Sequence, residues 1–173
     1  MRAITVGGLP GTGTSTLCRL LAARTGLTYV YAGQLFRDEA KARGMSLADF
    51  GRLCQSDPSV DRALDDQQAA LLHGPPLLLE GRLAGWLAHQ NGIDAVKVWL
   101  TCDLEERVRR VAERDGGDAE GQREAILERE ASEADRYRRY YGLDLGDMTP
   151  YDLVLDATAA TPEVLAAAVL QAP

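Results

Sequence analysis

The sequence has few aromatic residues, histidines and cysteines, and it lacks any long hydrophobic run. His73 and His89 lie in no group with other ligand or nucleophile residues, so we interpret both as structural. The three cysteines have no metal-ligand spacing, and we expect reduced thiols in a cytoplasmic protein. No apolar run approaches a membrane span and the first strand begins almost at once, so we expect neither a membrane anchor nor a signal peptide.

Positive charge is also scarce, because 26 Asp and Glu residues stand against 19 Lys and Arg residues, a formal net charge of −7. A chain of this charge lacks the basic surface with which proteins bind duplex nucleic acid. The basic residues are unevenly spread, since arginines concentrate in residues 107–139. A length of 173 residues suffices for one domain with a buried core.

A glycine-rich turn between a strand and a helix is the most informative stretch. Residues 3–6 are apolar enough for a buried strand, and residues 16–24 have a helical pattern. The turn between them consists of Gly8, Leu9, Pro10, Gly11, Thr12, Gly13, Thr14, Ser15 and Thr16. In such a loop the backbone N–H groups and the helix N-terminus bind a polyphosphate. The context predicts a phosphate-binding loop, with a plain tight turn as the alternative.

One position of this loop departs from the usual phosphate-binding pattern. Ser15 stands where a hydroxyl binds Mg²⁺, but Thr14 occupies the position of the usual lysine. That lysine normally neutralises the β- and γ-phosphates. If the loop performs catalysis, other cations must therefore supply the charge.

Strand and helix patterns alternate along the rest of the chain. Strand patterns at 27–31, 77–79, 95–100 and 151–156 are separated by helical stretches. This alternation predicts an α/β fold, a three-layer sandwich in which helices cover both faces of a parallel sheet of about five strands.

Polar residues near these strands are candidates for a site. Arg82 follows the strand at 77–79, and ligands of open α/β sheets bind at the carboxyl ends of strands. Asp57, Asp61 and Asp65 recur at intervals of four, which places them on one helical face. That face contacts either solvent or a substrate, and the spacing does not decide between the two.

Two arginine-rich helices joined by a glycine break at 116–117 predict a lid that closes over anions. Their aligned residues are Arg107, Arg110 and Arg114 in the first helix and Arg129, Glu133, Arg136 and Tyr140 in the second. The alternative is a charged helix pair held together by its own ion pairs. We favour the lid because these are the clustered arginines of a chain whose loop lacks its lysine.

Taken in order, the motifs resemble the nucleoside monophosphate kinases, and most closely the archaeal-type (type 2) cytidylate kinases. The resemblance extends from Ile4 to about Thr158 and includes the loop with threonine in place of lysine. It rests on residues 8–16, 32–37, 57–61, 80–86, 132–137, 141–142 and 151–154.

The resemblance implies a P-loop kinase in which residues 8–16 hold the ATP phosphates and Ser15 faces Mg²⁺. The substrate-binding residues that it implies are Arg37, Asp61, Arg82, Arg129, Glu133 and Arg136. We expect Ser15, Arg110, Arg129 and Arg136 to act in catalysis, with the lid arginines Arg107, Arg110, Arg114, Arg129 and Arg136 replacing the missing lysine.

The implied activity is the ATP- and Mg²⁺-dependent phosphorylation of CMP, and of dCMP, by a cytoplasmic monomer that binds neither nucleic acid nor membranes. The implied division is a core (1–31, 75–114 and 150–173), a monophosphate-binding region (32–74) and a lid (115–142). Two alternatives stay open: a kinase of another nucleoside monophosphate or small molecule, and a non-catalytic ATP-binding regulator.

Overall fold

A parallel sheet of five strands runs through the computed structural model, which describes residues 1–172 except for the side chain of Ala48. The strands are β1 (Ala3–Gly8), β2 (Thr28–Tyr31), β3 (Leu77–Glu80), β4 (Ala95–Thr101) and β5 (Leu153–Asp156). Their spatial order is β2-β3-β1-β4-β5, and all neighbours pair in parallel. The predicted fold class is confirmed, although β5 begins two residues later than the sequence pattern indicates.

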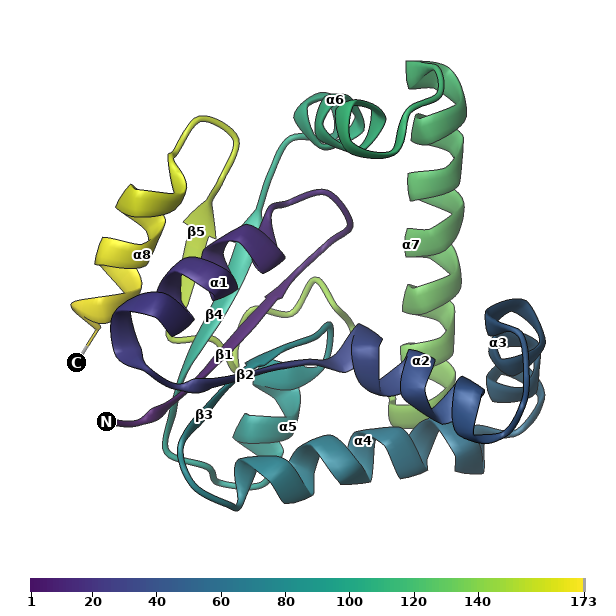
Figure 1. The fold of residues 1–173 in the computed structure, drawn as a ribbon, viewed down its shortest axis with the longest axis horizontal. Helices are drawn as coiled ribbons and strands as arrows, with labels where there is room; N and C mark the ends of the chain where they lie inside the picture. Colours follow the sequence, from purple (N-terminus) through teal and green to yellow (C-terminus); the bar gives the residue numbers. More distant parts are fainter. Residues whose placement is uncertain (173) are drawn as a thin grey trace.

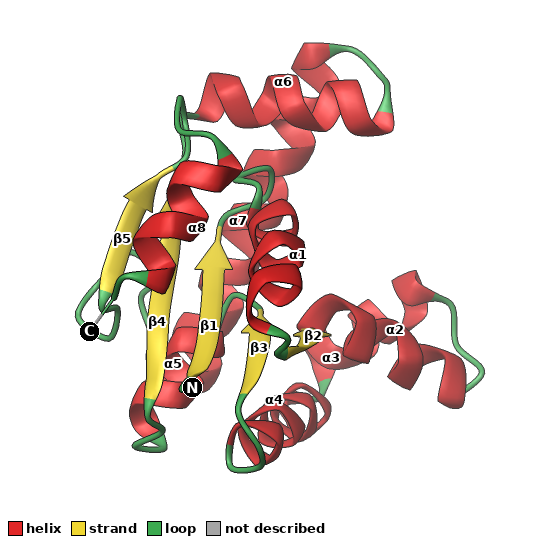
Figure 2. Ribbon diagram, turned by 60° about the vertical axis from the view of Figure 1, so that its left-hand side comes forward, coloured by secondary structure: helices red, strands yellow, loops and turns green. Residues whose placement is uncertain are grey.

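Helices cover both faces of the sheet (Figure 1, Figure 2). Helices α1 (Thr14–Thr25) and α8 (Pro162–Leu170) pack side by side on one face. Helices α4 (Pro58–Leu72) and α5 (Ala84–Gln90) pack on the other face. Among residues 1–172, no helix combines the length and the apolar character that crossing a membrane requires.

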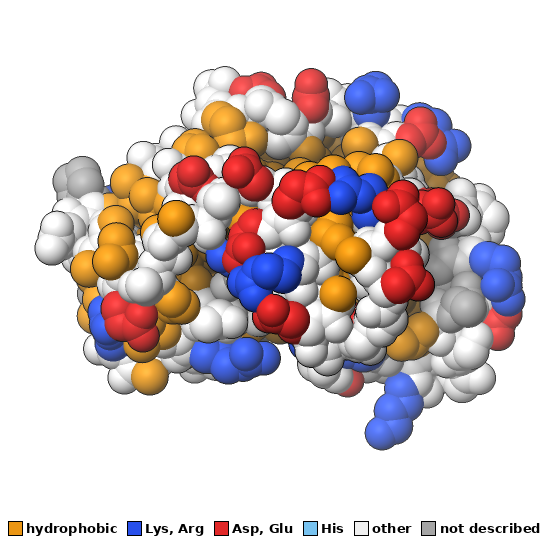
Figure 3. Space-filling model, turned by 90° about the horizontal axis from the view of Figure 1, so that it is seen from above, with side chains coloured by type: hydrophobic (Ala, Val, Ile, Leu, Met, Phe, Trp, Pro, Cys, Tyr) orange, Lys and Arg blue, Asp and Glu red, His pale blue; other side chains and the backbone are white. Residues whose placement is uncertain are grey.

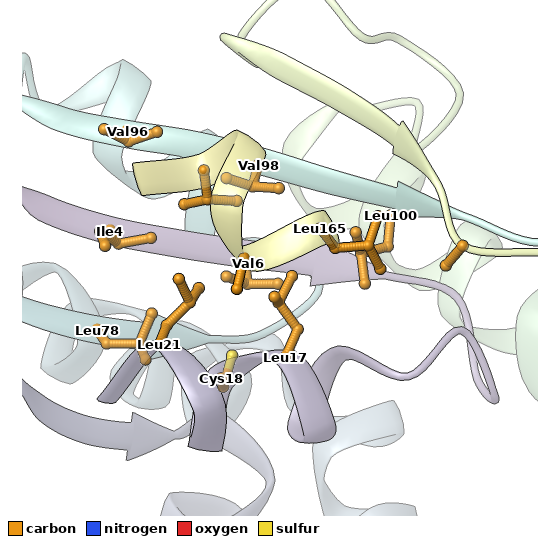
Figure 4. Packing of buried hydrophobic residues seen from close by; sticks show 13 residues of the cluster. Ile4, Val6, Leu17, Cys18, Leu21, Leu78, Val96, Val98, Leu100 and Leu165 are labelled. Carbon is orange, nitrogen blue, oxygen red and sulfur yellow. The ribbon is translucent and has the colours of Figure 1, made fainter. Parts of the chain in front are cut away.

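Alternate residues of β1 fill the two sides of the core. Ile4 and Val6 pack with Leu17 and Leu165 from α1 and α8 (Figure 4), whereas Ala3 packs with the residues of α4 and α5. Strands buried on both faces need nearly continuous apolar sequence. Each fully buried Leu or Val contributes about 1.5–3 kcal/mol to folding. Cys18, Cys54 and Cys102 are free thiols, as predicted.

The remaining helices lie beyond the carboxyl ends of the strands, where they surround the candidate site. They are α2 (Ala32–Ala42), α3 (Leu47–Ser56), α6 (Leu104–Asp115) and α7 (Ala119–Tyr141). Helix α6 ends at Asp115 with Gly116 as its C-cap, which confirms the predicted break before α7. The long helix α7 packs against α6, and its Tyr140 donates to the carbonyls of Cys54 and Gln55 at the end of α3 (3.0 and 2.9 Å). One helix therefore touches both helical flanks of the sheet (Figure 1).

Candidate active site

The loop between β1 and α1 has the geometry of an anion-binding turn. Gly11 and Gly13 adopt positive φ angles of 84° and 94°, which favour glycine. A Cβ atom at Gly8 would lie 2.6 Å from the Thr12 hydroxyl, so this position has no room for a side chain. Helix α1 begins at Thr14 without a side-chain cap, which leaves its first N–H groups free for a ligand.

A buried carboxylate faces the start of α1. Glu80 ends β3 and pairs in register with Val6 of β1, two residues before the loop begins. Its Oε1 atom accepts hydrogen bonds from the hydroxyls of Thr14 (2.6 Å) and Ser15 (2.8 Å). Its Oε2 atom accepts from the Tyr29 hydroxyl, and burial together with this carboxylate raises the pKa of Tyr29. Sequence reasoning selected Arg82 from this segment and missed Glu80 and Tyr29.

A cavity of about 450 Å³ opens among β2, α2, α4, the β3–α5 turn and α7. All six residues expected to bind substrate line it: Arg37, Asp61, Arg82, Arg129, Glu133 and Arg136. They come from segments up to 99 positions apart, so the fold gathers them into one place. The cavity also includes apolar side chains, among them Phe36 and Leu64, which can hold the face of a ring.

Ion pairs preorganise the arginine side of this cavity. The buried carboxylate of Glu133 accepts from Arg82 Nε (2.8 Å) and from Arg129 Nε (2.9 Å). Burial alone would raise the pKa of Glu133, but the two guanidinium groups outweigh it and hold the pKa below its usual value. The N–H groups that these arginines do not use on Glu133 remain available to an anion.

The three aspartates with a spacing of four have different surroundings. Asp57 is half-buried and caps α4 by accepting from the Ser59 N–H (2.9 Å). Asp61 is buried and lies 3.0 Å from Arg136 Nε, and burial raises its pKa although Arg136 opposes this. Asp65 lines the same cavity and accepts from the Tyr141 hydroxyl. Asp57 thus caps the helix outside the cavity, whereas Asp61 and Asp65 line the cavity.

Residues 3–159 match the sequence model of the "Cytidylate kinase-like family". The chain belongs to this family. It is 45% identical over 162 residues to a protein named cytidylate kinase from Methanopyrus kandleri, covering 90% of this chain and 84% of that one. It is 44% identical over 165 residues to a cytidylate kinase from Methanospirillum hungatei, covering 94% and 91% of the two chains.

Solved structures share the fold of this cytidylate kinase-like chain at low identity. An uncharacterized protein from Eubacterium ventriosum superposes with a TM-score of 0.76 and 15% identity, covering 98% of this chain and 96% of that one. Shikimate kinase from Acinetobacter baumannii, in complex with shikimate, has a TM-score of 0.63 and 14% identity, covering 99% and 92%. At this identity the likeness concerns the fold alone.

The three α6 arginines expected in the lid, Arg107, Arg110 and Arg114, lie outside the cavity of this cytidylate kinase-like protein. Arg107 is buried, where it pairs with Glu130 of α7 and donates to the Pro10 carbonyl (3.2 Å). Arg110 donates to the carbonyls of Thr12 (3.2 Å) and Ala157 (2.7 Å).

Arg114, the third, pairs with its neighbour Asp115. Part of the expected arginine cluster thus supports the backbone of the phosphate-binding loop. On the face seen in Figure 3, basic and acidic side chains lie next to one another, as such ion pairs require.

A hollow of about 530 Å³ lies at the opposite edge of the sheet. Its lining includes Arg2, Pro76 and Asp94, which stand at or before the amino ends of β1, β3 and β4. This edge lacks the glycine-rich loop and the arginines that line the cavity. The glycine-rich loop and the arginines therefore point to the carboxyl edge of the sheet, where proteins with open α/β sheets bind their ligands.

Proposed function

We propose that this chain transfers the γ-phosphoryl group of ATP to CMP, and also to dCMP. Two relatives named cytidylate kinase are 44–45% identical to it over nine-tenths or more of its length, and this similarity carries the proposal. The cavity beside the phosphate-binding loop supports it, because an arginine-lined side suits a monophosphate and an apolar lining suits a base.

The ATP phosphates bind at the loop of residues 8–16, on the free N–H groups at the start of α1. The acceptor monophosphate binds between Arg37, Arg82 and Arg129, which approach the cavity from three separate segments. Arginine suits this task because its planar group can donate two parallel hydrogen bonds to phosphate oxygens.

The residues beside the loop fit Mg²⁺. The Ser15 hydroxyl and the Glu80 carboxylate are hard oxygen donors 2.8 Å apart, and Mg²⁺ prefers such donors together with substrate phosphates. Within residues 1–172, no group of three or more His, Cys, Asp or Glu residues could hold a metal alone. The protein ligands would therefore be Ser15 and Glu80, with substrate phosphates as the further donors that Mg²⁺ prefers. When bound there, Mg²⁺ would neutralise the negative charge of the phosphates during transfer.

Catalysis in this class of reaction rests on positioning and charge neutralisation. Arg129 and Arg136 from α7 neutralise the transferring group, and Arg110 holds the loop from its other side. Closure of the lid (115–142) against the monophosphate-binding region (32–74) excludes water, which would otherwise accept the phosphoryl group. The core (1–31, 75–114 and 150–173) stays fixed, and the enzyme works as a cytoplasmic monomer.

The proposal is tested by a coupled ADP-release assay with ATP, Mg²⁺ and one acceptor at a time: CMP, dCMP, UMP, AMP or GMP. Turnover with CMP and dCMP well above the others supports it. Preference for another monophosphate would contradict the assignment of CMP as the acceptor, but phosphoryl transfer from ATP would remain the reaction. Because Thr14 replaces the lysine, a non-catalytic regulator is the second candidate, and ATP binding without turnover of any acceptor would establish it.

A further inference from the structure

The cavity has two chemically different sides. Arginines of α2, α7 and the β3–α5 turn supply positive charge to one side. The other side is formed by Asp61, Asp65 and Gln68 of α4, whose side chains carry acceptor oxygen atoms. A ligand group that lies against α4 must therefore carry hydrogen-bond donors.

Asp65 is the carboxylate of this side that no cation neutralises. Asp61 forms an ion pair with Arg136, whereas Asp65 forms none with the Lys and Arg residues that the structure describes. Its hydrogen-bond donors are neutral: the Tyr141 hydroxyl and the amide of Gln68 (3.1 Å). A carboxylate accepts about four hydrogen bonds, so Asp65 retains the capacity for two more.

An open acceptor beside Asp65 also points to a missing donor. Asp61 is 6% exposed, and its Oδ2 atom lies 3.0 Å from Arg136 Nε in an ion pair that lacks hydrogen-bond geometry, so this oxygen can still accept from a further donor. Gln68 is equally buried, and both N–H donors of its amide are directed to other acceptors, the Leu64 carbonyl (3.4 Å) and Asp65. Leaving buried polar groups unpaired is costly, so a ligand that supplies donors stabilises this side.

We propose that Asp65 is the specificity-determining residue that makes the acceptor site select cytosine over uracil. This inference rests on the proposed function. The 4-amino group of cytosine has two N–H donors, which satisfy the Asp65 carboxylate and the open acceptor of Asp61. Uracil has a carbonyl oxygen at position 4. This acceptor would face the acceptor oxygens of Asp65 and Asp61 without a proton between them. A binding site that forms a hydrogen bond with its ligand rejects an analogue that leaves the polar group of the site without a partner.

The decisive variant is Asp65→Asn, whose amide can donate to the uracil oxygen while keeping the shape of the side chain. We expect the ratio of kcat/KM for CMP to that for UMP to fall by about tenfold or more, as expected of one well-formed contact with a base edge. Asp66→Asn is the matched control, because it removes the same charge from the adjacent, exposed position. It should leave the ratio unchanged.

Equilibrium binding of CMP and UMP by calorimetry separates this inference from the proposed function. A wild-type protein that binds CMP better than UMP but turns over neither contradicts the activity and still allows the Asp65 test on affinities. A ratio in Asp65→Asn within about twofold of wild type overturns the role of Asp65. Tyr141→Phe, which removes one donor to Asp65 without a charge change, is the second variant, and we expect a smaller decrease of the same ratio.

Discussion

The hydroxyl of Thr14 donates a 2.6 Å hydrogen bond to the Oε1 atom of Glu80. The residue that replaces the usual lysine is thus bound to an acidic side chain and brings no positive charge to the loop. It shares the Oε1 atom of Glu80 with the Ser15 hydroxyl. Under the proposed function, neutralising the transferring group would therefore be left to Mg²⁺ and to arginines.

We predict that Glu80→Gln lowers kcat/KM by about 100-fold and raises the Mg²⁺ concentration needed for half-maximal activity, because groups that orient a metal site typically contribute 10–100-fold. Thr14→Val removes one hydrogen bond and should cost about tenfold or less. The measurement is ADP release with CMP as Mg²⁺ is varied. Equal losses in the two variants would contradict the view that Thr14 only positions Glu80.

Arg136→Ala should lower kcat with CMP by about 100-fold or more, since donors aimed at developing charge contribute about 10²–10³. Arg136→Lys should restore part of the loss, because the charge returns without the planar group. The control is Arg139→Ala on the same helix, where the exposed side chain forms an ion pair with Asp135, lies over the Tyr140 ring and does not line the cavity. An unchanged kcat in Arg136→Ala would contradict the proposed role of Arg136 in catalysis.

Arg107→Ala should reduce the free energy of unfolding by about 3–5 kcal/mol, because it leaves Glu130 without its partner in a largely buried pair. Arg114→Ala breaks an exposed pair and should cost at most about 1 kcal/mol. Urea unfolding of both variants at pH 7 makes the comparison. Similar stabilities would show that Arg107 does not anchor the loop to α6 and α7.

Asp65 should destabilise the free protein at neutral pH. Burial raises its pKa from 3.8 to about 6, so the folded chain holds a proton over a pH range in which the unfolded chain has lost it. The stability of wild type therefore falls as the pH rises from about 4 to about 6 and stays low above that range. We predict that the stabilisation by Asp65→Asn is about 1 kcal/mol larger at pH 7.5 than at pH 5.5. Urea unfolding at the two pH values measures it, and an equal or smaller effect at pH 7.5 would contradict the unpaired charge.

Local patterns predict most of the fold. Alternating strands and helices indicate the parallel sheet, and the residues that begin α3 and α4 indicate their caps, since Ser46 and Asp57 both accept a backbone N–H in the first turn. These features depend on neighbours within a few positions, which the sequence displays directly.

The site is less predictable because it depends on how distant segments meet. Glu80 lies next to the loop because β3 pairs with β1. The sequence of neither strand indicates which strand it will pair with. The spacing of Arg107 and Arg110 correctly predicts one shared helix side, but not that this side faces loop carbonyls. The contact of Tyr141 with Asp65 joins residues 76 positions apart.

Helix α7 binds both flanks of the site, and this has a thermodynamic consequence. Through Glu130 it holds Arg107, which contacts the donor loop at Pro10, and through Tyr140 it holds the end of α3 on the acceptor flank. At 23 residues it spans about 35 Å as one continuous rod. A ligand that immobilises one end of α7 also restricts the other end. The second ligand then costs less conformational entropy when it binds there. Donor and acceptor should therefore increase each other's affinity by the same factor, as linkage demands.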